Sequence, residues 1–225
     1  MCSNLIIGKE VKKIFDEVLD SRQALIISPW IDGEYAKSVF KMIKEDRARV
    51  ITSMDDNNDL YKLVMEYIQN NDIYVTRYVT NEKYRAVGIM LILLGIIFMA
   101  LTKINDLFVL IGFLVLIFGI AFIGSGRAQI KEVVPWLLNI RFSPSQGSDG
   151  FIHIKLYVTD RNAYLGSANM TYSAWAKNFE AMVKIPKEDA ITLFDKAWSI
   201  TRSIEDLQRQ VKGQVEESMK VKSGN

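Results

Sequence analysis

The first 80 residues alternate between short apolar runs and longer segments in which apolar positions recur every three or four residues. The short runs predict strands, and the longer segments predict amphipathic helices. The expected strands cover 24–29, 49–53 and 72–78, and the expected helices cover 8–20, 34–45 and 58–70. Strands that alternate with helices are typical of an α/β fold with a parallel or mixed sheet.

A strict two-residue alternation returns at 151–158, just before the turn-forming residues 160–162. One face of this expected strand is apolar and the other mixes aromatic and basic side chains. The apolar face carries Ile152, Ile154, Leu156 and Val158, and the other face carries Phe151, His153, Lys155 and Tyr157. Around it we expect strands at 140–142, 163–166 and 179–185, a loop at 143–150, and a last helix that begins at Pro186.

Two long apolar runs, 86–101 and 107–124, contain no charged residue and are separated by the polar break Thr102–Asp106. Each run is close to the lower limit of roughly 17 residues for a membrane-spanning helix, so together they predict a transmembrane hairpin. The alternative is a pair of buried core helices. Four glycines at seven-residue spacing would allow the two helices to approach closely. They are Gly88, Gly95, Gly112 and Gly119.

Positive charge gathers outside the hairpin rather than in its turn, which carries Lys103 next to Asp106. The flanking basic residues are Arg77, Lys83, Arg85, Arg127 and Lys131. The positive-inside rule therefore predicts an integral membrane protein with both ends of the hairpin, and the domain that flanks it, in the cytoplasm. Residues 127–135 are expected to lie along the membrane surface, with Trp136 as an interfacial anchor.

Composition adds little to this picture. Hydrophobic residues make up 49% of the 225-residue chain, as a globular domain with an added apolar hairpin requires. The 28 basic and 26 acidic residues leave a net charge of +2, which neither requires nor excludes nucleic acid as a partner. The single cysteine, Cys2, excludes an intrachain disulfide and fits a reducing compartment. The polar first 20 residues do not predict a signal peptide.

The one histidine of the chain lies among polar residues that are suited to phosphate chemistry. His153 and Lys155 leave the same face of the expected strand, so a nucleophile or proton carrier stands beside a phosphate-binding cation. A solvated face of an edge strand would explain this pair equally well. Ser167 and Asn169 follow at a strand-to-helix junction, where a hydroxyl, an amide and backbone N–H groups can hold an anion. Helix capping is the alternative for these two residues.

Taken together, these residues resemble the HKD signature of the phospholipase D superfamily. The pattern H-x-K-x4-D ends at Asp160, G-S-x-N ends at Asn169, and Glu180 follows with Asn178 before it. The resemblance covers roughly residues 151–185, and the early strand ending in Ser-Pro-Trp-Ile-Asp is also similar to the family. It implies a phospholipase D-like α/β/α sandwich with a mixed sheet, here interrupted by the two-helix transmembrane hairpin.

The resemblance further implies phosphodiester cleavage through a covalent phosphohistidine, with no metal and no cofactor. The expected catalytic residues are His153, Lys155, Asn169 and Glu180, supported by Ser167 and Asp160. The histidine would attack phosphorus, or act as the acid when it comes from the partner subunit. The lysine and the amide would hold the phosphate oxygens with the serine assisting, and the glutamate would orient the imidazole. The aspartate is expected to be structural.

In-line displacement uses one imidazole to attack and a second one to protonate the leaving alkoxide. The chain has one histidine and one copy of the motif, so we expect a homodimer with its two-fold axis between the two His153 side chains. The catalytic domain is expected in two parts, 1–85 and 125–225, around the hairpin at 86–124.

These points predict a membrane-anchored phosphodiesterase that is endonuclease-like. A phospholipase D or phosphatidyltransferase acting on membrane phospholipid is the first alternative, because both reactions use the same mechanism. A non-catalytic membrane scaffold with this fold is an alternative of another class, although a scaffold has no need of the complete polar set. The expected partners are a second copy of the chain, the lipid bilayer, and a nucleic acid or phospholipid substrate.

Overall fold

A computed structural model describes residues 4–101 and 107–207 of the protein. The predicted polar break between the apolar runs and the end of the chain beyond residue 207 lie outside the described residues. The contacts between residues divide the chain into two compact units. One unit comprises Met1–Ile73 and Val133–Asn225, and the other comprises Tyr74–Glu132. The second unit therefore extends beyond the apolar runs on both sides.

A seven-stranded mixed sheet forms the centre of the first unit, in the order β1-β9-β8-β7-β2-β3-β6. Its strands are β1 (Leu5–Ile7), β2 (Ala24–Ile27), β3 (Ala48–Ser53), β6 (Ile140–Ser143), β7 (Lys155–Val158), β8 (Ala163–Gly166) and β9 (Ala181–Lys184). The three strands β2, β3 and β6 are parallel to one another, whereas the other neighbours in the sheet pair antiparallel. The predicted α/β fold with a mixed sheet is thus confirmed.

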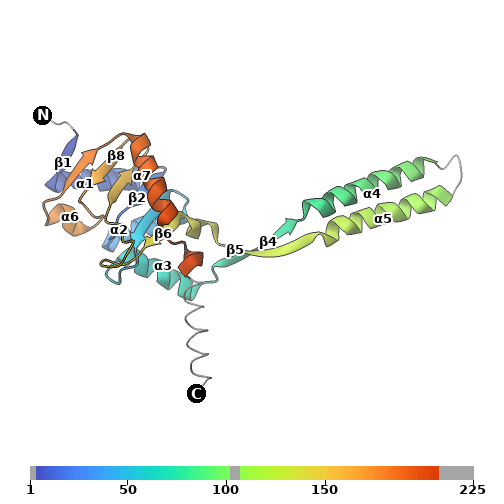
Figure 1. Cartoon of the computed structure of the whole chain (residues 1–225), viewed down its shortest axis with the longest axis horizontal. Coiled ribbons are helices and arrows are strands. Elements are labelled where there is room, and N and C mark those ends of the chain that lie inside the picture. The colour runs from blue at the N-terminus through green and yellow to red at the C-terminus, as the bar shows by residue number, and fades with distance from the viewer. Residues whose placement is uncertain (1–3, 102–106, 208–225) are drawn as a thin grey trace, which may run out of the picture. The chain divides into compact units, whose positions relative to one another are not determined.

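Helices cover both faces of this sheet, which makes the unit an α/β/α sandwich (Figure 1). The helices are α1 (Val11–Asp20), α2 (Gly33–Lys44), α3 (Asp59–Asn70), α6 (Tyr172–Ala176) and α7 (Lys187–Ile200), with 3-10 turns η1 (Gly8–Glu10) and η3 (Pro135–Asn139). Because side chains alternate along a strand, Ile26 packs with α1, α2 and α3, while the next residue, Ile27, packs against Phe194 of α7. Both faces of the central strands are therefore apolar, as a sheet covered on both sides requires.

The motif strand is shorter than the two-residue alternation predicts. It begins at Lys155 rather than at residue 151, because the partner strands end there: Lys155 pairs with Gly166, the last residue of β8. Residues 151–154 are irregular. The face that was expected to be polar is also buried from Lys155 onward, since Tyr157 packs between β7 and α1 with no exposed surface. His153 therefore lies outside the ladder, at the edge of the sheet.

The second unit consists of a two-stranded ribbon followed by two long helices. The ribbon pairs β4 (Tyr74–Thr80) with β5 (Arg127–Val133), and the helices are α4 (Glu82–Ala100) and α5 (Leu107–Ser125). An ion pair joins Arg77 and Glu132 across the ribbon, with 3.6 Å between the charged atoms. Residues 127–133, expected along the membrane surface, are thus a paired strand.

Glycines bring α4 and α5 into backbone contact, as their spacing predicts. A Cβ added to Gly95 would lie 2.7 Å from the carbonyl oxygen of Gly112, and one added to Gly88 would lie 2.8 Å from that of Gly119. The remaining faces of both helices expose large apolar side chains, including Met90 and Phe118. Both helices are long and apolar enough to cross a membrane. Since the described protein leaves their outer surfaces uncovered, they are not core helices of the α/β unit.

Candidate active site

The topology of the sheet brings the motif residues to one edge. Lys155 at the start of β7 pairs with Gly166 at the end of β8, and Gly166 pairs with Met182 near the start of β9. The residues just beyond these pairs, His153, Ser167 and Glu180, therefore emerge at the same edge of the sheet. Glycine is required at position 166 because a Cβ there would collide with the carbonyl oxygen of Ala181. The glycine of the motif thus permits the close strand approach that carries Ser167 to Glu180.

Lys155 is a buried cation, with only 3% of its surface exposed. Its Nζ donates a hydrogen bond of 3.4 Å to the carbonyl oxygen of His153. Burial lowers the pKa of the Lys155 ammonium, and the negative charge of Glu180 opposes that shift. An ammonium group that has lost most of its water is a strong electrostatic partner for an arriving phosphate anion.

His153 is exposed at the sheet edge and lies among aromatic rings. The centroids of its imidazole and the Trp30 ring are 6.1 Å apart at an angle of 80°, and Phe151 lies 5.6 Å away. Desolvation lowers the pKa of His153, and the positive charge of Lys155 lowers it further. The neutral imidazole, which is the nucleophilic form, is therefore favoured at neutral pH. Within the described part of the chain, the ring makes no hydrogen bond.

Ser167 and Glu180 form a tight polar pair across the ends of β8 and β9. The Ser167 hydroxyl donates to the Glu180 carboxylate and accepts a 3.1 Å hydrogen bond from the backbone N–H of Ala181. The side-chain amide of Asn178 donates to the same carboxylate over 3.3 Å. This network positions the carboxylate close enough to Lys155 to act on its charge, but no hydrogen bond links the carboxylate to the imidazole in the described chain. The hydrogen bond by which Glu180 was expected to orient the imidazole is therefore not formed within one protomer.

Asn169 lies at the junction where β8 leads into α6. Its Oδ1 atom is buried and has no hydrogen-bond partner among residues 4–101 and 107–207. The junction is held by neighbours: the N–H of Met170 donates to the Ser28 hydroxyl over 3.0 Å, and Thr171 caps α6 by accepting from Ala174. A buried amide group left without a partner is costly unless a ligand or water satisfies it. Asn169 is therefore available to a ligand.

Asp160 does not contribute to the sheet edge that carries the histidine. It lies in the β7–β8 turn and accepts hydrogen bonds from the backbone N–H groups of Arg22 (2.8 Å) and Gln23 (3.4 Å). These hydrogen bonds lower the pKa of its carboxyl group. The aspartate thus connects the turn to the segment between α1 and β2, which is consistent with the structural role expected for it.

Two aromatic residues belong to this site although neither was among the expected catalytic or supporting residues. Trp30, at the end of the early strand, packs against both Phe151 and His153. Tyr157 is fully buried, and its hydroxyl donates a 2.7 Å hydrogen bond to the carbonyl oxygen of Ala168, so it ties the two halves of the motif together. Tyr157 shares the strand face of His153 and Lys155, which was the available signal. The strand-end position of Trp30 was the other.

Comparisons with known proteins agree with this reading. Residues 124–199 match the family model described as cardiolipin synthase, PLD-like domain. No curated protein matches the chain. The match covers the motif and about a third of the chain, and it supports the resemblance to the phospholipase D superfamily that was drawn from the sequence.

Solved structures with a similar fold are more distant. Nuc from Salmonella typhimurium, described as a phospholipase D family member, is 12% identical and is matched over 88% of this chain and 96% of its own, with a TM-score of 0.44. NucT from Helicobacter pylori is 10% identical over 89% of this chain and 97% of its own, with a TM-score of 0.45. The archaeal chromatin protein TrmBL2 is 8% identical over 90% of this chain and 55% of its own, with a TM-score of 0.35.

Proposed function

We propose that the protein is a membrane-anchored phosphodiesterase that forms a covalent phosphohistidine in a dimeric HKD site. One observation carries this proposal: an imidazole kept neutral stands at a sheet edge beside the buried ammonium of Lys155. The side chain of Asn169 emerges from the same region; its Oδ1 atom has no partner among the described residues, and its NH2 group is the donor that would bind a phosphate oxygen. A nucleophile, a cation and a free amide are the groups that phosphoryl transfer requires.

The proposed reaction has two steps. The His153 nitrogen attacks phosphorus, so that a P–N bond forms while the P–O bond to the leaving group breaks. The leaving alkoxide takes a proton from a second imidazole, which then acts as a base toward water when the P–N bond is hydrolysed. Lys155 and Asn169 hold the phosphate oxygens, whose charge grows in the transition state, and Ser167 assists them.

A homodimer would supply the second imidazole, because each chain has a single histidine. It would also account for the missing hydrogen bond on the ring. In the described chain, Glu180 is bonded to Ser167 and Asn178 rather than to His153. We therefore propose that the carboxylate of one protomer orients the imidazole of the other across a two-fold axis.

The substrate class that we favour is nucleic acid, on the resemblance to single-motif members of the superfamily. Phospholipid is the second candidate, with hydrolysis or phosphatidyl transfer as the reaction. It is supported by the description of the matching family as cardiolipin synthase and by the apolar surface of α4 and α5. We propose that these two helices cross a membrane as a hairpin and that the α/β unit lies in the cytoplasm.

The substrate is tested with purified protein in lipid nanodiscs. Single-stranded DNA, single-stranded RNA, phosphatidylglycerol and cardiolipin are assayed in parallel, with the His153→Ala variant as the blank. We expect cleavage of nucleic acid that EDTA does not abolish. Cleavage of lipid alone would reverse the order of the two candidates. Cleavage of none of these by an intact dimer would favour the scaffold, and loss of all activity on chelation would exclude the metal-free mechanism.

The dimer is tested by pairing wild-type chains with His153→Ala chains. Forced heterodimers retain one imidazole per site and should turn over poorly per wild-type chain. Undiminished activity would show that each protomer acts alone.

The orientation is tested in sealed cells with a thiol reagent that does not cross membranes. A cysteine introduced by Ser148→Cys, in a Cys2→Ser background, should stay protected until the cells are opened. Labelling from outside would place the catalytic unit on the other side of the membrane.

A further inference from the structure

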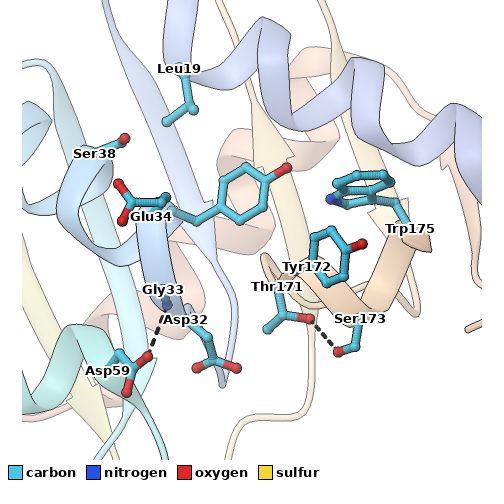
Figure 2. A pocket seen from close by; sticks show the side chains of 11 residues that line it. Leu19, Asp32, Gly33, Glu34, Ser38, Asp59, Thr171, Tyr172, Ser173 and Trp175 are labelled. Carbon is cyan, nitrogen blue, oxygen red and sulfur yellow. Dashed lines mark hydrogen bonds between the residues drawn. The ribbon is translucent and has the colours of Figure 1, made fainter. Parts of the chain in front are cut away.

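A second concave site lies within the α/β unit, between α1, α2 and α6, and the mechanism above does not use it. This pocket has a volume of about 660 Å³, which is within the range of small-molecule sites. Figure 2 shows its residues. They are Leu19, Asp32, Gly33, Glu34, Tyr35, Ser38, Asp59, Thr171, Tyr172, Ser173 and Trp175. No basic side chain is among them, so an anion such as a phosphate is not the expected occupant.

Aromatic rings form the walls of the pocket. Tyr172 and Trp175, one turn apart on α6, have ring centroids 4.9 Å apart and planes at 76° to each other. This is an edge-to-face contact, and both residues line the pocket. The Trp175 ring already attracts a cation, since the Lys12 ammonium lies 5.8 Å from its centroid. Aromatic walls of this kind favour alkylated ammonium groups, because the negative faces of the rings attract the charge while the methyl groups pack against carbon.

Three carboxylates line the pocket, but two of them are already engaged. Glu34 forms an ion pair with Lys37 at 2.7 Å, and in Figure 2 its carboxylate points away from Trp175. Asp59 accepts a 2.9 Å hydrogen bond from the backbone N–H of Gly33 and lies 3.4 Å from the ammonium of Lys62. Their charges are thus balanced within the protein.

Asp32 is the carboxylate that remains. It stands at the N-cap position of α2, yet its side chain makes no capping hydrogen bond, and the N–H of Gly33 donates to Asp59. Its Oδ1 atom is buried and has no partner in the part of the chain that the structure describes. Figure 2 places this carboxylate on the side of Thr171 and Tyr172. Burial is the main cause that raises the pKa of Asp32, followed by the charge of Asp59. A hydrogen bond with the backbone of Asp59 and the charge of Lys62 act in the opposite direction. The carboxylate is therefore half-buried with one oxygen unsatisfied, and a cation that approached it would gain from its charge.

We propose that this pocket binds a small organic cation of the methylated ammonium class, with Asp32 as its counter-ion and the rings of Tyr172 and Trp175 as its walls. A metal ion fits less well, because Glu34 and Asp59 are already paired and no group of metal-ligating residues is found within residues 4–101 and 107–207. The cation can be a free molecule or the headgroup of a choline lipid, since both present the same chemistry.

The pocket is built from the same two segments as the candidate active site. Trp30 contacts His153 and Asp32 lines the pocket two residues later, while Asn169 precedes the pocket residue Thr171 by two. Ile31 and Met170 form a bridge between these segments, and the N–H of Asp32 donates to the carbonyl oxygen of Met170 over 3.3 Å. Binding of a cation in the pocket would thus affect the position of the two segments that carry Trp30 and Asn169.

The test measures binding rather than turnover, so its outcome is independent of the proposed catalysis. His153→Ala protein in phosphatidylglycerol nanodiscs is titrated calorimetrically with choline, and separately with 3,3-dimethylbutanol, a neutral molecule of the same shape. We expect saturable binding of choline, at least about tenfold tighter than that of the alcohol. Equal binding of the two would reduce the site to an apolar pocket and overturn the proposal, as would the absence of saturable choline binding.

Variants separate the counter-ion from its neighbours. Asp32→Asn keeps the shape of the side chain and should weaken choline binding at least about tenfold. Glu34→Gln, the matched control on the same helix, should leave the affinity within about twofold, because that carboxylate is paired and turned away. Tyr172→Ala removes one wall and should weaken binding about fivefold or more. Unchanged affinity in Asp32→Asn, with an unaltered unfolding temperature, would overturn the assignment.

The source of the cation is found by changing the lipid. Nanodiscs that contain phosphatidylcholine should compete with added choline if the headgroup reaches the pocket, and the apparent affinity would then fall. An unchanged affinity would identify a free cation as the occupant. Both results support the site, and they separate its two sources.

Discussion

The two units of this protein treat apolar side chains in opposite ways. In the α/β unit Phe194 is completely buried between α7 and the sheet, whereas on α5 Phe118 is 68% exposed. The first unit is stabilised by removing apolar surface from water, which contributes roughly 25 cal/mol per Å². On α4 and α5 the buried positions are glycines, and the large side chains face outward. The same residue types are thus buried in one unit and exposed in the other, and the exposed ones lie on helices that are long and apolar enough to cross a membrane.

The comparison also shows where polar groups are placed. The α/β unit gathers its histidine, buried lysine and amide at one sheet edge. There the histidine is exposed to water while the lysine is shielded from it. The paired helices α4 and α5 hold apolar residues and glycines along most of their length. The proposed reaction site and the proposed anchor can therefore be tested separately by substitution.

The largest expected effect concerns the histidine. His153→Ala should reduce phosphodiesterase activity by about a thousandfold or more, because His153 is the proposed nucleophile and the chain has no other imidazole to replace it. Membrane association should not change, since the imidazole is exposed and lies in the α/β unit. Activity assays and sedimentation with membranes measure the two properties separately. Lys13→Ala, at an exposed position of α1, serves as the control and should keep full activity.

The second prediction compares two exposed apolar residues, one in each unit. Phe118→Arg should oppose membrane insertion of α5 by about 3 kcal/mol, because a charge near the middle of a spanning helix loses its hydration. Leu138→Arg, at a residue of η3 that is 52% exposed, should change stability by no more than about 0.5 kcal/mol. A membrane-insertion assay and a thermal unfolding curve provide the measurements. Better solubility of Phe118→Arg with no loss of insertion would show that α5 faces water.

A third prediction concerns the contact between the two helices. Gly112→Ala places a Cβ 2.6 Å from the carbonyl oxygen of Gly95 and should destabilise the helix pair by about 1–3 kcal/mol. Gly124→Ala, on the same helix with open space around it, should be neutral or slightly stabilising because alanine favours helix. Unfolding of the helical signal in detergent micelles distinguishes the two variants. Equal behaviour would mean that the helices do not pack through their glycines.

The smallest effect is a titration shift, which NMR can follow because the chain has one imidazole. Burial and the charge of Lys155 lower the pKa of His153, so its resonance should titrate below 6.5. The folded protein then binds fewer protons than the unfolded chain around that pH. This histidine therefore opposes folding as the pH falls through 6.5 toward the lower folded value. Lys155→Met should raise the midpoint of the His153 titration. An unchanged midpoint would mean that desolvation alone lowers the pKa of His153.

Much of the fold was predictable because its signals are local. The periodicity of apolar residues places β8 at 163–166 and the last helix after Pro186, both confirmed. The two apolar runs form paired helices. The glycines at seven-residue spacing lie where the two helices touch, as predicted. The order and spacing of His153, Lys155 and Asn169 were sufficient to show the resemblance to the phospholipase D superfamily, and the match of residues 124–199 supports it.

Other features depend on partners that are distant in sequence. The edge strand Leu5–Ile7 is three residues long and is stabilised by pairing with Ala181–Val183, so its own sequence carried too little signal. The motif strand begins at Lys155 because its neighbours end there, although the alternation continues back to residue 151. Pairing over more than a hundred residues of separation is decided by the whole sheet and not by a local pattern.

The sequence by itself determined which chemical groups are present, the class of fold and the existence of two kinds of apolar segment, because composition and periodicity are local properties. Only the tertiary structure decided how those groups are used. It buried the ammonium of Lys155, bound Glu180 to Ser167 rather than to the histidine, and left the Oδ1 atom of Asp32 without a hydrogen-bond partner among the described residues. The charge state and availability of a side chain depend on the water that its neighbours remove and on the hydrogen bonds that they supply. In this protein those neighbours come from segments far apart in the chain.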